Sequence, residues 1–358
     1  MTVKPDKIPT VVVVGTMPPP ICGTTVSLMT LYQYLANSKR IQARLIETGG
    51  IRRSGIRGGF KFLKVLARLF WLARDSDVIA LNLCSTAVPI LFPFVWIVRL
   101  LFGCRIILRI FGGRGHDSYT GMNRRLLRWS MESCDLLLLQ TKALLASADQ
   151  LDIKSSDYFP TNRPRSSSNR PRDGCSRFVS IGWVGVAKGV PLAMDVIENS
   201  ANDITYDVYG PFTDGLSERD FDGKKRCIYR GLVSPGKVHE TLQNYDAVLL
   251  PTTWKGEGYP GIIIEAFQAG MPVITTNWRS IPELVDESCG MLVPIEDPTA
   301  LAQAVERISS DSKFYSKLCQ AAGKRGLQFD SAHWNEEFVG MCCSLQLPRH
   351  LPQNRGTL

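Results

Sequence analysis

Residues 256–276, GEGYPGIIIEAFQAGMPVITT, are the part of the chain whose local fold the sequence constrains most. An apolar run with one Glu inside it lies between a Gly/Pro turn and a Gly-x-Pro stop, which predicts a short helix from about 260 to 269. Proline suits the first turn of a helix, because the N–H that it lacks would have no partner there. A buried strand is expected at 271–275 and another at 247–251. The stretch therefore predicts a strand–loop–helix–strand unit.

Three features of this unit suit a ligand that carries both phosphate and hydroxyl groups. Glu257 lies at the carboxyl end of the first strand, where ligands bind in open α/β sheets. The amides of Gly261 and Ile262 lie in the first helical turn, at the positive end of the helix dipole, which favours a phosphate. Glu265 lies more than one turn further along and can accept hydrogen bonds from a diol such as a ribose. An ordinary surface loop and amphipathic helix would leave the apolar run around a single Glu unexplained.

The spacing of the two glutamates and the residues around them resemble the nucleotide-sugar glycosyltransferases of family 4. Glu257 and Glu265 match the E-x7-E signature of that family, and the acidic–Gly–aromatic–Pro and Gly-x-Pro-Val segments match its surroundings. The resemblance implies the GT-B fold, an α/β architecture of two Rossmann-like, doubly wound parallel-sheet domains that face a central cleft. It extends over nearly the whole chain, but its specific motifs lie in the second half.

The size and charge of the chain agree with two domains and an anionic partner. At 358 residues it can form two substantial cores, and its net charge of +9 favours phosphates, anionic lipid or nucleic acid as partners. Ten cysteines without any C-x-x-C motif favour reduced thiols in a cytoplasmic protein over a disulfide framework or a zinc site. The N-terminal segment MTVKPDKIPTVVVVG predicts a first strand rather than a signal peptide.

The segment TNRPRSSSNRPRDG, residues 161–174, has the Pro/Ser/Arg-rich composition of a linker. We place the domain boundary near residues 162–173, with an acceptor-binding domain at residues 1–165 and a nucleotide-sugar-binding domain at 166–330. The family resemblance implies that a C-terminal helix, within about 331–358, packs back on the first domain.

The resemblance also implies a lysine that grips the donor diphosphate. Lys188 and Gly189 match the Lys-Gly pair of the family, although Trp183 stands where the family has an arginine. Arg279 and Arg230 are the candidates that we consider for the missing positive charge. Lys188 is therefore the strongest phosphate candidate in the second half.

Other loops supply further candidates by the same resemblance. The loop TMPPPICGTT lacks G-x-G-x-x-G, which argues against a dinucleotide fingerprint, but its Gly23 matches the first glycine of a phosphate-binding pair. Val233 lies in a loop expected to line the nucleotide base. His116 is a catalytic candidate from the first domain, because Phe111 occupies the position at which many relatives have a histidine. Arg109 and Arg114 are candidates for the acceptor side.

Residues 51–74, IRRSGIRGGFKFLKVLARLFWLAR, carry seven Lys or Arg and no acid. They resemble an amphipathic helix that rests on anionic lipid; the alternative is a core helix whose basic side chains reach solvent. Nucleic-acid binding is not expected, because the aromatic residues form no stacking platform. The stretch 88–102, VPILFPFVWIVRLLF, predicts a buried or partly interfacial helix that is too short for a membrane span.

No metal is expected. Asp75-Ser76-Asp77 matches the D-x-D motif of metal-dependent glycosyltransferases, but we interpret it as a turn before a strand. Without a metal, the protein itself must supply fixed positive charge to a departing diphosphate. We expect Lys188, the helix start at Gly261 and Ile262, and the loop at Gly23 to supply it.

The resemblance implies transfer of a hexose-type sugar with retention of anomeric configuration. Glu257 would contact the sugar and Glu265 the ribose. The expected acceptor is a saccharide or lipid-linked saccharide in the synthesis of cell-surface polysaccharide, and the expected location is cytoplasmic, peripheral to the membrane. Two alternatives remain, a relative that binds nucleotide-sugar but has lost catalysis, and a GT-B epimerase or phosphorylase.

Overall fold

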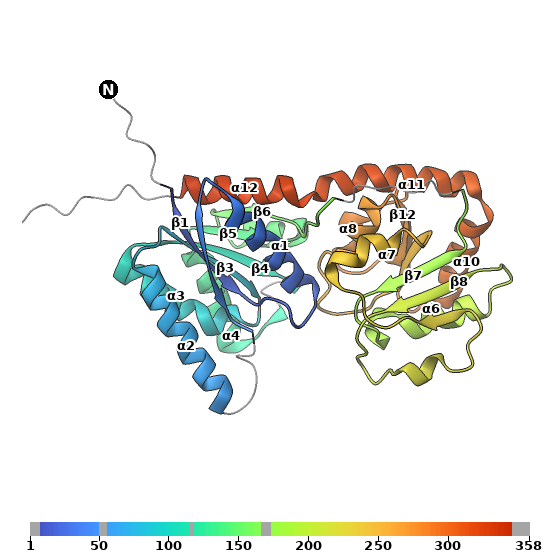
Figure 1. The fold of residues 1–358 in the computed structure, drawn as a ribbon, viewed down its shortest axis with the longest axis horizontal. Helices are drawn as coiled ribbons and strands as arrows, with labels where there is room; N and C mark the ends of the chain where they lie inside the picture. The colour runs from blue at the N-terminus through green and yellow to red at the C-terminus, as the bar shows by residue number, and fades with distance from the viewer. Residues whose placement is uncertain (1–7, 50–55, 115–117, 166–172, 346–358) are drawn as a thin grey trace, which may run out of the picture.

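The computed structural model describes residues 8–49, 56–114, 118–165 and 173–345. It contains two lobes, each built on a parallel sheet of six strands (Figure 1). The strands of the first sheet are β1 (Thr10–Gly15), β2 (Gln42–Glu47), β3 (Val78–Cys84), β4 (Arg105–Phe111), β5 (Leu136–Leu139) and β6 (Ser156–Tyr158). Those of the second are β7 (Arg177–Ile181), β8 (Thr205–Tyr209), β9 (Cys227–Tyr229), β10 (Ala247–Leu250), β11 (Val273–Thr276) and β12 (Gly290–Val293).

Helices connect the strands and cover both faces of each sheet. The first lobe contains α1 (Gly23–Asn37), α2 (Ile56–Ala73), α3 (Val88–Phe102), α4 (Gly121–Ser133) and α5 (Lys142–Gln150). The second contains the 3-10 turn η2 (Val186–Lys188), α6 (Val190–Glu198), α7 (Val238–Leu242), α8 (Gly261–Gln268), α9 (Ile281–Leu284), α10 (Pro298–Ser310) and α11 (Ser312–Gly326), and α12 (Ser331–Ser344) follows. The predicted α/β class with two doubly wound parallel sheets is confirmed.

The strand order marks where ligands bind in such sheets. The order in the second sheet is β12-β11-β10-β7-β8-β9, so the direction of winding reverses between β7 and β10. In the first sheet, β2-β1-β3-β4-β5-β6, it reverses between β1 and β3. Crevices outside the carboxyl ends of the strands at such switch points are the usual ligand sites of open α/β sheets.

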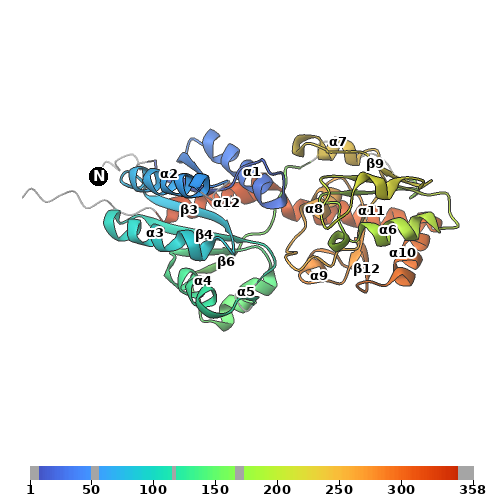
Figure 2. The same cartoon turned by 90° about the horizontal axis from the view of Figure 1, so that it is seen from below.

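Each sheet has one hydrophobic core on each of its faces. In the first lobe, α2 to α5 pack on one face around residues such as Leu69, Phe92 and Leu127. Helices α1 and α12 cover the opposite face, where Leu31 and Phe338 belong to the same hydrophobic core. The four consecutive valines of β1 have no solvent exposure because both faces of this central strand are covered. Figure 2 shows that α2 and α3 lie at the end of this lobe remote from the second lobe.

The chain crosses between the lobes twice, and the two crossings are hydrogen-bonded to each other. The backbone N–H of Arg163 donates to Phe329 O at 3.0 Å, and Ser331 N–H donates to Arg163 O at 2.9 Å. Beyond this point α12 lies over the first lobe, so that α11 and α12 together extend along both lobes (Figure 1). The side chains of Phe338, Val339 and Cys342 anchor α12 in the core of the first lobe.

Several boundaries differ from those expected. The helix predicted from about 260 is α8, which starts at Gly261, and Pro260 is its N-cap residue rather than its first helical residue. The strand predicted at 271–275 is β11, two residues later, because Met271 and Pro272 complete the turn. Strands β2, β6 and β12 and helices α7 and α11 were not predicted as separate elements. Within the described ranges, every helix is too short or too polar to reach across a lipid bilayer.

Candidate functional site

The switch point of the second sheet brings together the two loops that carry Lys188 and Glu257. Strands β7 and β10 are neighbours in this sheet, and each is followed by one of the loops. Lys188 ends the 3-10 turn after β7. Glu257 lies between β10 and α8. The backbones of the loops are joined, since Thr253 N–H donates to Ala187 O at 2.9 Å.

Lys188 and Glu257 form an ion pair. The Lys188 Nζ lies 2.5 Å from Glu257 Oε2, and the same oxygen accepts a hydrogen bond of 2.9 Å from the hydroxyl of Thr252. Glu257 is 7% exposed. A charge so well buried needs its partner, because an unpaired one would carry a large desolvation cost. The ammonium and the carboxylate are thereby held at the end of the sheet where a ligand is expected.

Gly189 makes this placement of Lys188 possible. It has φ of +75°, in the left-handed region that side chains disfavour. A β-carbon there would also collide with the carbonyl of Pro251, at the end of β10. The Lys-Gly pair is thus explained by backbone geometry as well as by the lysine charge.

The first lobe meets the second at Glu257. The N–H of Gly113, in the loop after β4, donates to Gly256 O at 3.2 Å. A β-carbon on Gly113 would overlap the carbonyl of Glu257. The neighbouring N–H of Gly112 donates to the side chain of Gln140 at 3.0 Å. The loop therefore touches the backbone of the candidate site directly.

Replacing Gly113 by alanine is expected to push the two loops apart. Because a displacement of about 1 Å at a reacting group can cost on the order of 10²-fold in rate, kcat should fall by about that factor. Thermal unfolding should change little, since the collision is between loops rather than in a core. Gly340→Ala, in α12 where the structure leaves room for a methyl group, is the matched control. An unchanged kcat for Gly113→Ala would contradict this arrangement.

Arg163, which the sequence analysis missed, joins three of the predicted positions. Its Nε lies 3.0 Å from Glu265 Oε1, and its Nη2 donates to Gly23 O at 3.5 Å. The guanidinium also lies against the backbone of Gly261, where a β-carbon would strike it. Its Nη1 donates to the hydroxyl of Ser27, in α1, at 2.8 Å. The side chain is only 3% exposed.

The starts of two helices therefore converge on one buried cation. Gly23 begins α1 and Gly261 begins α8. No side chain of the described residues caps the first turn of α8. Helix N-termini and a guanidinium all favour an anion. The two helix starts and the guanidinium therefore give this part of the structure a positive potential, which favours an anion nearby.

The remaining candidates lie elsewhere. Val233 is half-buried in the loop after β9, packed against the core that also contains Tyr209. Trp183 stacks edge-on against Trp254, with ring centroids 5.7 Å apart. His116 lies outside the described residues.

Neither arginine proposed for the missing charge contacts Lys188 or Glu257. Arg230 is paired with Asp207 at 2.8 Å, and Arg279 stacks on the ring of Trp278. The cation that reaches the start of α8 is Arg163 instead, from the segment between the lobes.

Arg109 does not reach the surface expected for an acceptor. It is buried between the rings of Phe111 and Phe159, with its guanidinium carbon 4.5 Å from each centroid. Burial, and then repulsion by Arg163, lower the pKa of Arg109 to about 9. The expectation failed because alternation along β4 points this residue toward the α1 side of the sheet.

Asp75 and Asp77 lie at the opposite edge of the sheet, before β3 rather than after it. Asp77 Oδ2 accepts the backbone N–H of Thr10 at 2.8 Å and so supports the start of β1. Across the described ranges, no three His, Cys, Asp or Glu side chains are grouped as metal ligands would be.

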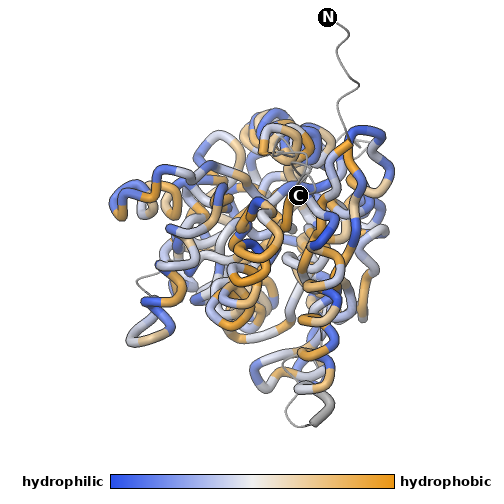
Figure 3. The backbone as a smooth tube through the Cα atoms, turned by 90° about the vertical axis from the view of Figure 1, so that its left-hand side faces the viewer, coloured by the Kyte–Doolittle hydropathy of each residue, from blue (hydrophilic) through white to orange (hydrophobic). Residues whose placement is uncertain are grey.

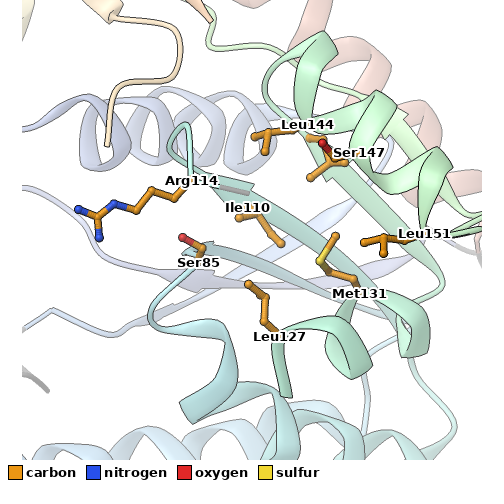
Figure 4. Close-up of a pocket in the computed structure, with 9 residues that line it drawn as sticks. Ser85, Ile110, Arg114, Leu127, Met131, Leu144, Ser147 and Leu151 are labelled. Atoms are coloured by element: carbon orange, nitrogen blue, oxygen red, sulfur yellow. The ribbon is translucent and has the colours of Figure 1, made fainter. Parts of the chain in front are cut away.

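A largely apolar pocket lies in the first lobe, at the carboxyl ends of β3, β4 and β5. It is lined by Ser85, Ile110, Arg114, Leu127, Met131, Leu139, Leu144, Ser147 and Leu151. In Figure 4 the apolar side chains face one another, while Arg114 extends away from them. Ser85 also shares a hydrogen bond of 2.6 Å with the Tyr119 hydroxyl.

Comparison with known proteins agrees with this architecture. Residues 176–311 match the family described as glycosyl transferases group 1. The chain is 26% identical over 128 residues to an uncharacterized 41.2 kDa protein in the cps region of Klebsiella pneumoniae, a match that covers 35% of each chain. It is 27% identical over 145 residues to the amylovoran biosynthesis glycosyltransferase AmsK of Erwinia amylovora, covering 37% of this chain and 36% of AmsK. The chain thus matches about a third of the length of these relatives.

Similarity to solved structures covers both lobes of the chain, whereas the family match covers only part of the second. The structure of HepE from Anabaena, in complex with UDP and glucose, superposes with a TM-score of 0.72 and 14% identity, covering 94% of this chain and all of HepE. Two facing lobes with parallel sheets of this kind define a GT-B protein. The family model of the group 1 glycosyltransferases matches residues 176–311, within the second lobe, which agrees with the resemblance of the E-x7-E motif to family 4.

Proposed function

We propose that the protein transfers a hexose-type sugar from a nucleotide-sugar donor to a saccharide or lipid-linked saccharide, with retention of anomeric configuration. The observation that carries this proposal is the ion pair between Lys188 and Glu257 at the switch point of the second sheet. When a sugar–diphosphate bond breaks, negative charge develops on the diphosphate and positive charge on the anomeric carbon. A cation and a carboxylate at this edge of the sheet can stabilise these two charges respectively.

In the proposed reaction, Lys188 turns its ammonium toward the leaving diphosphate when the donor binds. This frees the carboxylate of Glu257 for the sugar hydroxyls and the positively charged anomeric carbon. The first-turn amides of Gly261 and Ile262, the loop at Gly23, and the guanidinium of Arg163 add fixed positive potential on the other side of the phosphates. Preorganised charges of this kind usually supply the largest part of catalysis.

Glu265 and Val233 are proposed to hold the nucleoside. Glu265 Oε1 is engaged by Arg163, while among the described residues Oε2 has no hydrogen-bond partner. We propose that Oε2 accepts a ribose hydroxyl. The loop that contains Val233, at the carboxyl ends of β8 and β9, is the proposed contact for the base. His116 remains a proposed catalytic contact from the first lobe.

The acceptor is proposed to bind in the first lobe. The pocket of Figure 4 opens at the carboxyl ends of β3 to β5. The pocket has room for only about 20 Å³, close to one water molecule, so it marks the end of the sheet where we propose that the acceptor binds rather than a preformed sugar site. AmsK is named for amylovoran biosynthesis, which supports a cell-surface polysaccharide as the product. The proposed location is cytoplasmic.

A donor screen tests this function. The protein is mixed with UDP-, GDP- and ADP-sugars, beginning with UDP-glucose because HepE was solved with UDP and glucose. One nucleotide class should raise the unfolding temperature, since ligand at about 100 times its Kd stabilises by about 2.7 kcal/mol. Release of free nucleotide should then require an acceptor and should continue in EDTA.

The outcomes of this screen separate the alternatives. Loss of all activity in EDTA would contradict a metal-independent site. Turnover that needs inorganic phosphate, or that proceeds without acceptor, would indicate a phosphorylase or an epimerase. Donor binding without transfer to any member of a broad acceptor panel would indicate a relative that has lost catalysis.

A further inference from the structure

Helices α2 and α3 pack side by side at the end of the first lobe and expose many large apolar side chains. We call this surface the α2–α3 face. It consists of Phe60, Leu63, Phe70 and Trp71 from α2 and of Ile90, Phe94, Ile97, Leu100 and Leu101 from α3, each between 37% and 67% exposed. In Figure 3, which views this end of the molecule, the apolar colour extends along neighbouring helices.

The face is part of a well-packed lobe and not a gap in its core. The opposite sides of both helices are buried, through residues such as Leu69 of α2 and Val95 of α3. Aromatic pairs join the helices: Phe62 and Phe94 have ring centroids 5.4 Å apart, and Phe70 and Phe102 are 5.0 Å apart. Soluble monomers rarely expose contiguous apolar surfaces on this scale, so the face indicates a binding partner.

Basic side chains flank the face. Lys61, Lys64 and Arg68 lie on the side of α2 nearest to β2, where Lys61 contacts Glu47 and Arg68 donates to Leu45 O. On the other side, α4 packs against α3 and carries the exposed Arg124, Arg125 and Arg128, of which Arg128 is paired with Glu132 on the same helix. Neither α2 nor α3 contains an Asp or a Glu. An apolar strip between two basic borders is complementary to a surface with anionic groups above an apolar interior.

We propose that the α2–α3 face binds the surface of an anionic phospholipid bilayer. Its apolar side chains would enter the boundary between headgroups and acyl chains, and the basic borders would contact lipid phosphates. A symmetric contact between two copies fits less well, because it would bring the basic borders of both together. The proposal does not depend on the transferase reaction, and it extends the basic stretch 51–74 to a surface that includes α3 and α4.

The test is sedimentation of the full chain with vesicles, without donor or acceptor. The protein should sediment with vesicles of equal parts phosphatidylcholine and phosphatidylglycerol, and much less with phosphatidylcholine alone. The double variant Leu63→Glu/Trp71→Glu should bind at least about tenfold more weakly. Ile295→Glu, at an exposed apolar residue of the second lobe, is the control and should bind as the wild type does.

The charged borders are tested separately. Lys64→Glu/Arg68→Glu, four residues apart on α2, should weaken binding about tenfold or more, since each basic residue near an anionic bilayer contributes about a fivefold factor. Lys313→Glu/Lys317→Glu, with the same spacing on α11, is the matched control. All of these positions are exposed, and unchanged thermal unfolding would show that the variants fold.

Three results would overturn the proposal. The first is a wild-type protein that does not sediment with the anionic vesicles. The second is binding that is equal on both compositions or unaffected by the α2–α3 variants. The third is a wild-type protein that forms a dimer and does not bind vesicles, and that Leu63→Glu/Trp71→Glu converts to a monomer. That result would assign the face to a second copy of the chain. Because no substrate is present, each result leaves the proposed reaction untouched.

Discussion

Lys188→Ala is expected to lower kcat by about 10²-fold or more, the usual effect of removing one preorganised electrostatic contact. The donor KM should change less, because the lysine acts mainly on charge that develops as the bond breaks. Glu257→Gln should show a loss of similar size, since it removes the negative charge but keeps the shape of the side chain. Steady-state release of nucleotide measures both variants.

The two effects should not add in the double variant. Lys188 and Glu257 contact each other at 2.5 Å, and residues that act as a unit give strongly non-additive losses. Lys313→Ala, in the exposed part of α11, is the control for a lost lysine. A near-normal kcat in either single variant, with the fold intact, would remove that residue from the mechanism.

Arg163→Met is expected to cost both stability and donor affinity. It would leave Glu265 largely buried without its partner, and breaking a buried ion pair from one side typically costs about 3–5 kcal/mol of unfolding free energy. The double variant Arg163→Met/Glu265→Gln should recover most of this loss, because the unpaired charge is gone. Donor binding should stay weak in both variants. Denaturant unfolding and donor titration measure the two effects independently.

Arg165→Met provides the matched control, since Arg165 lies two residues further along the same segment and is exposed. It should change neither the free energy of unfolding nor the donor affinity. If Arg163→Met binds donor normally while losing stability, the residue has a purely structural role between the lobes. If Arg163→Met changes neither the free energy of unfolding nor the donor affinity, the contacts of this guanidinium with the two helix starts contribute nothing measurable.

The sequence predicted those features that short stretches determine by themselves. The β10–α8–β11 unit could be predicted because the Gly/Pro turn, the apolar run and the Gly-x-Pro stop each limit the backbone locally. Lys188 and Glu257 could be placed in the loops that follow two different strands, but their contact depends on β7 and β10 being neighbours. The sequence alone does not specify that strand order, so their ion pair emerged only from the fold.

Arg163 could not be predicted, because its partners are remote in the chain. Ser27 and Glu265 lie 136 and 102 residues away from it, and the composition around it indicated only a linker. For α3 the sequence left two alternatives open, a buried helix and a partly interfacial one. A helix that is apolar around its whole circumference suggests burial on all sides, and only the packing shows that Ile97 and Leu101 face outward.

The joined crossings between the lobes have a mechanical consequence. Two covalent connections are held together there by backbone hydrogen bonds at Arg163 and Ser331, so we expect any relative motion of the lobes to be a bending about that point. The guanidinium that meets Glu265 therefore extends from the pivot itself. A ligand that changed the contacts of this guanidinium would therefore act directly at the connection between the two lobes.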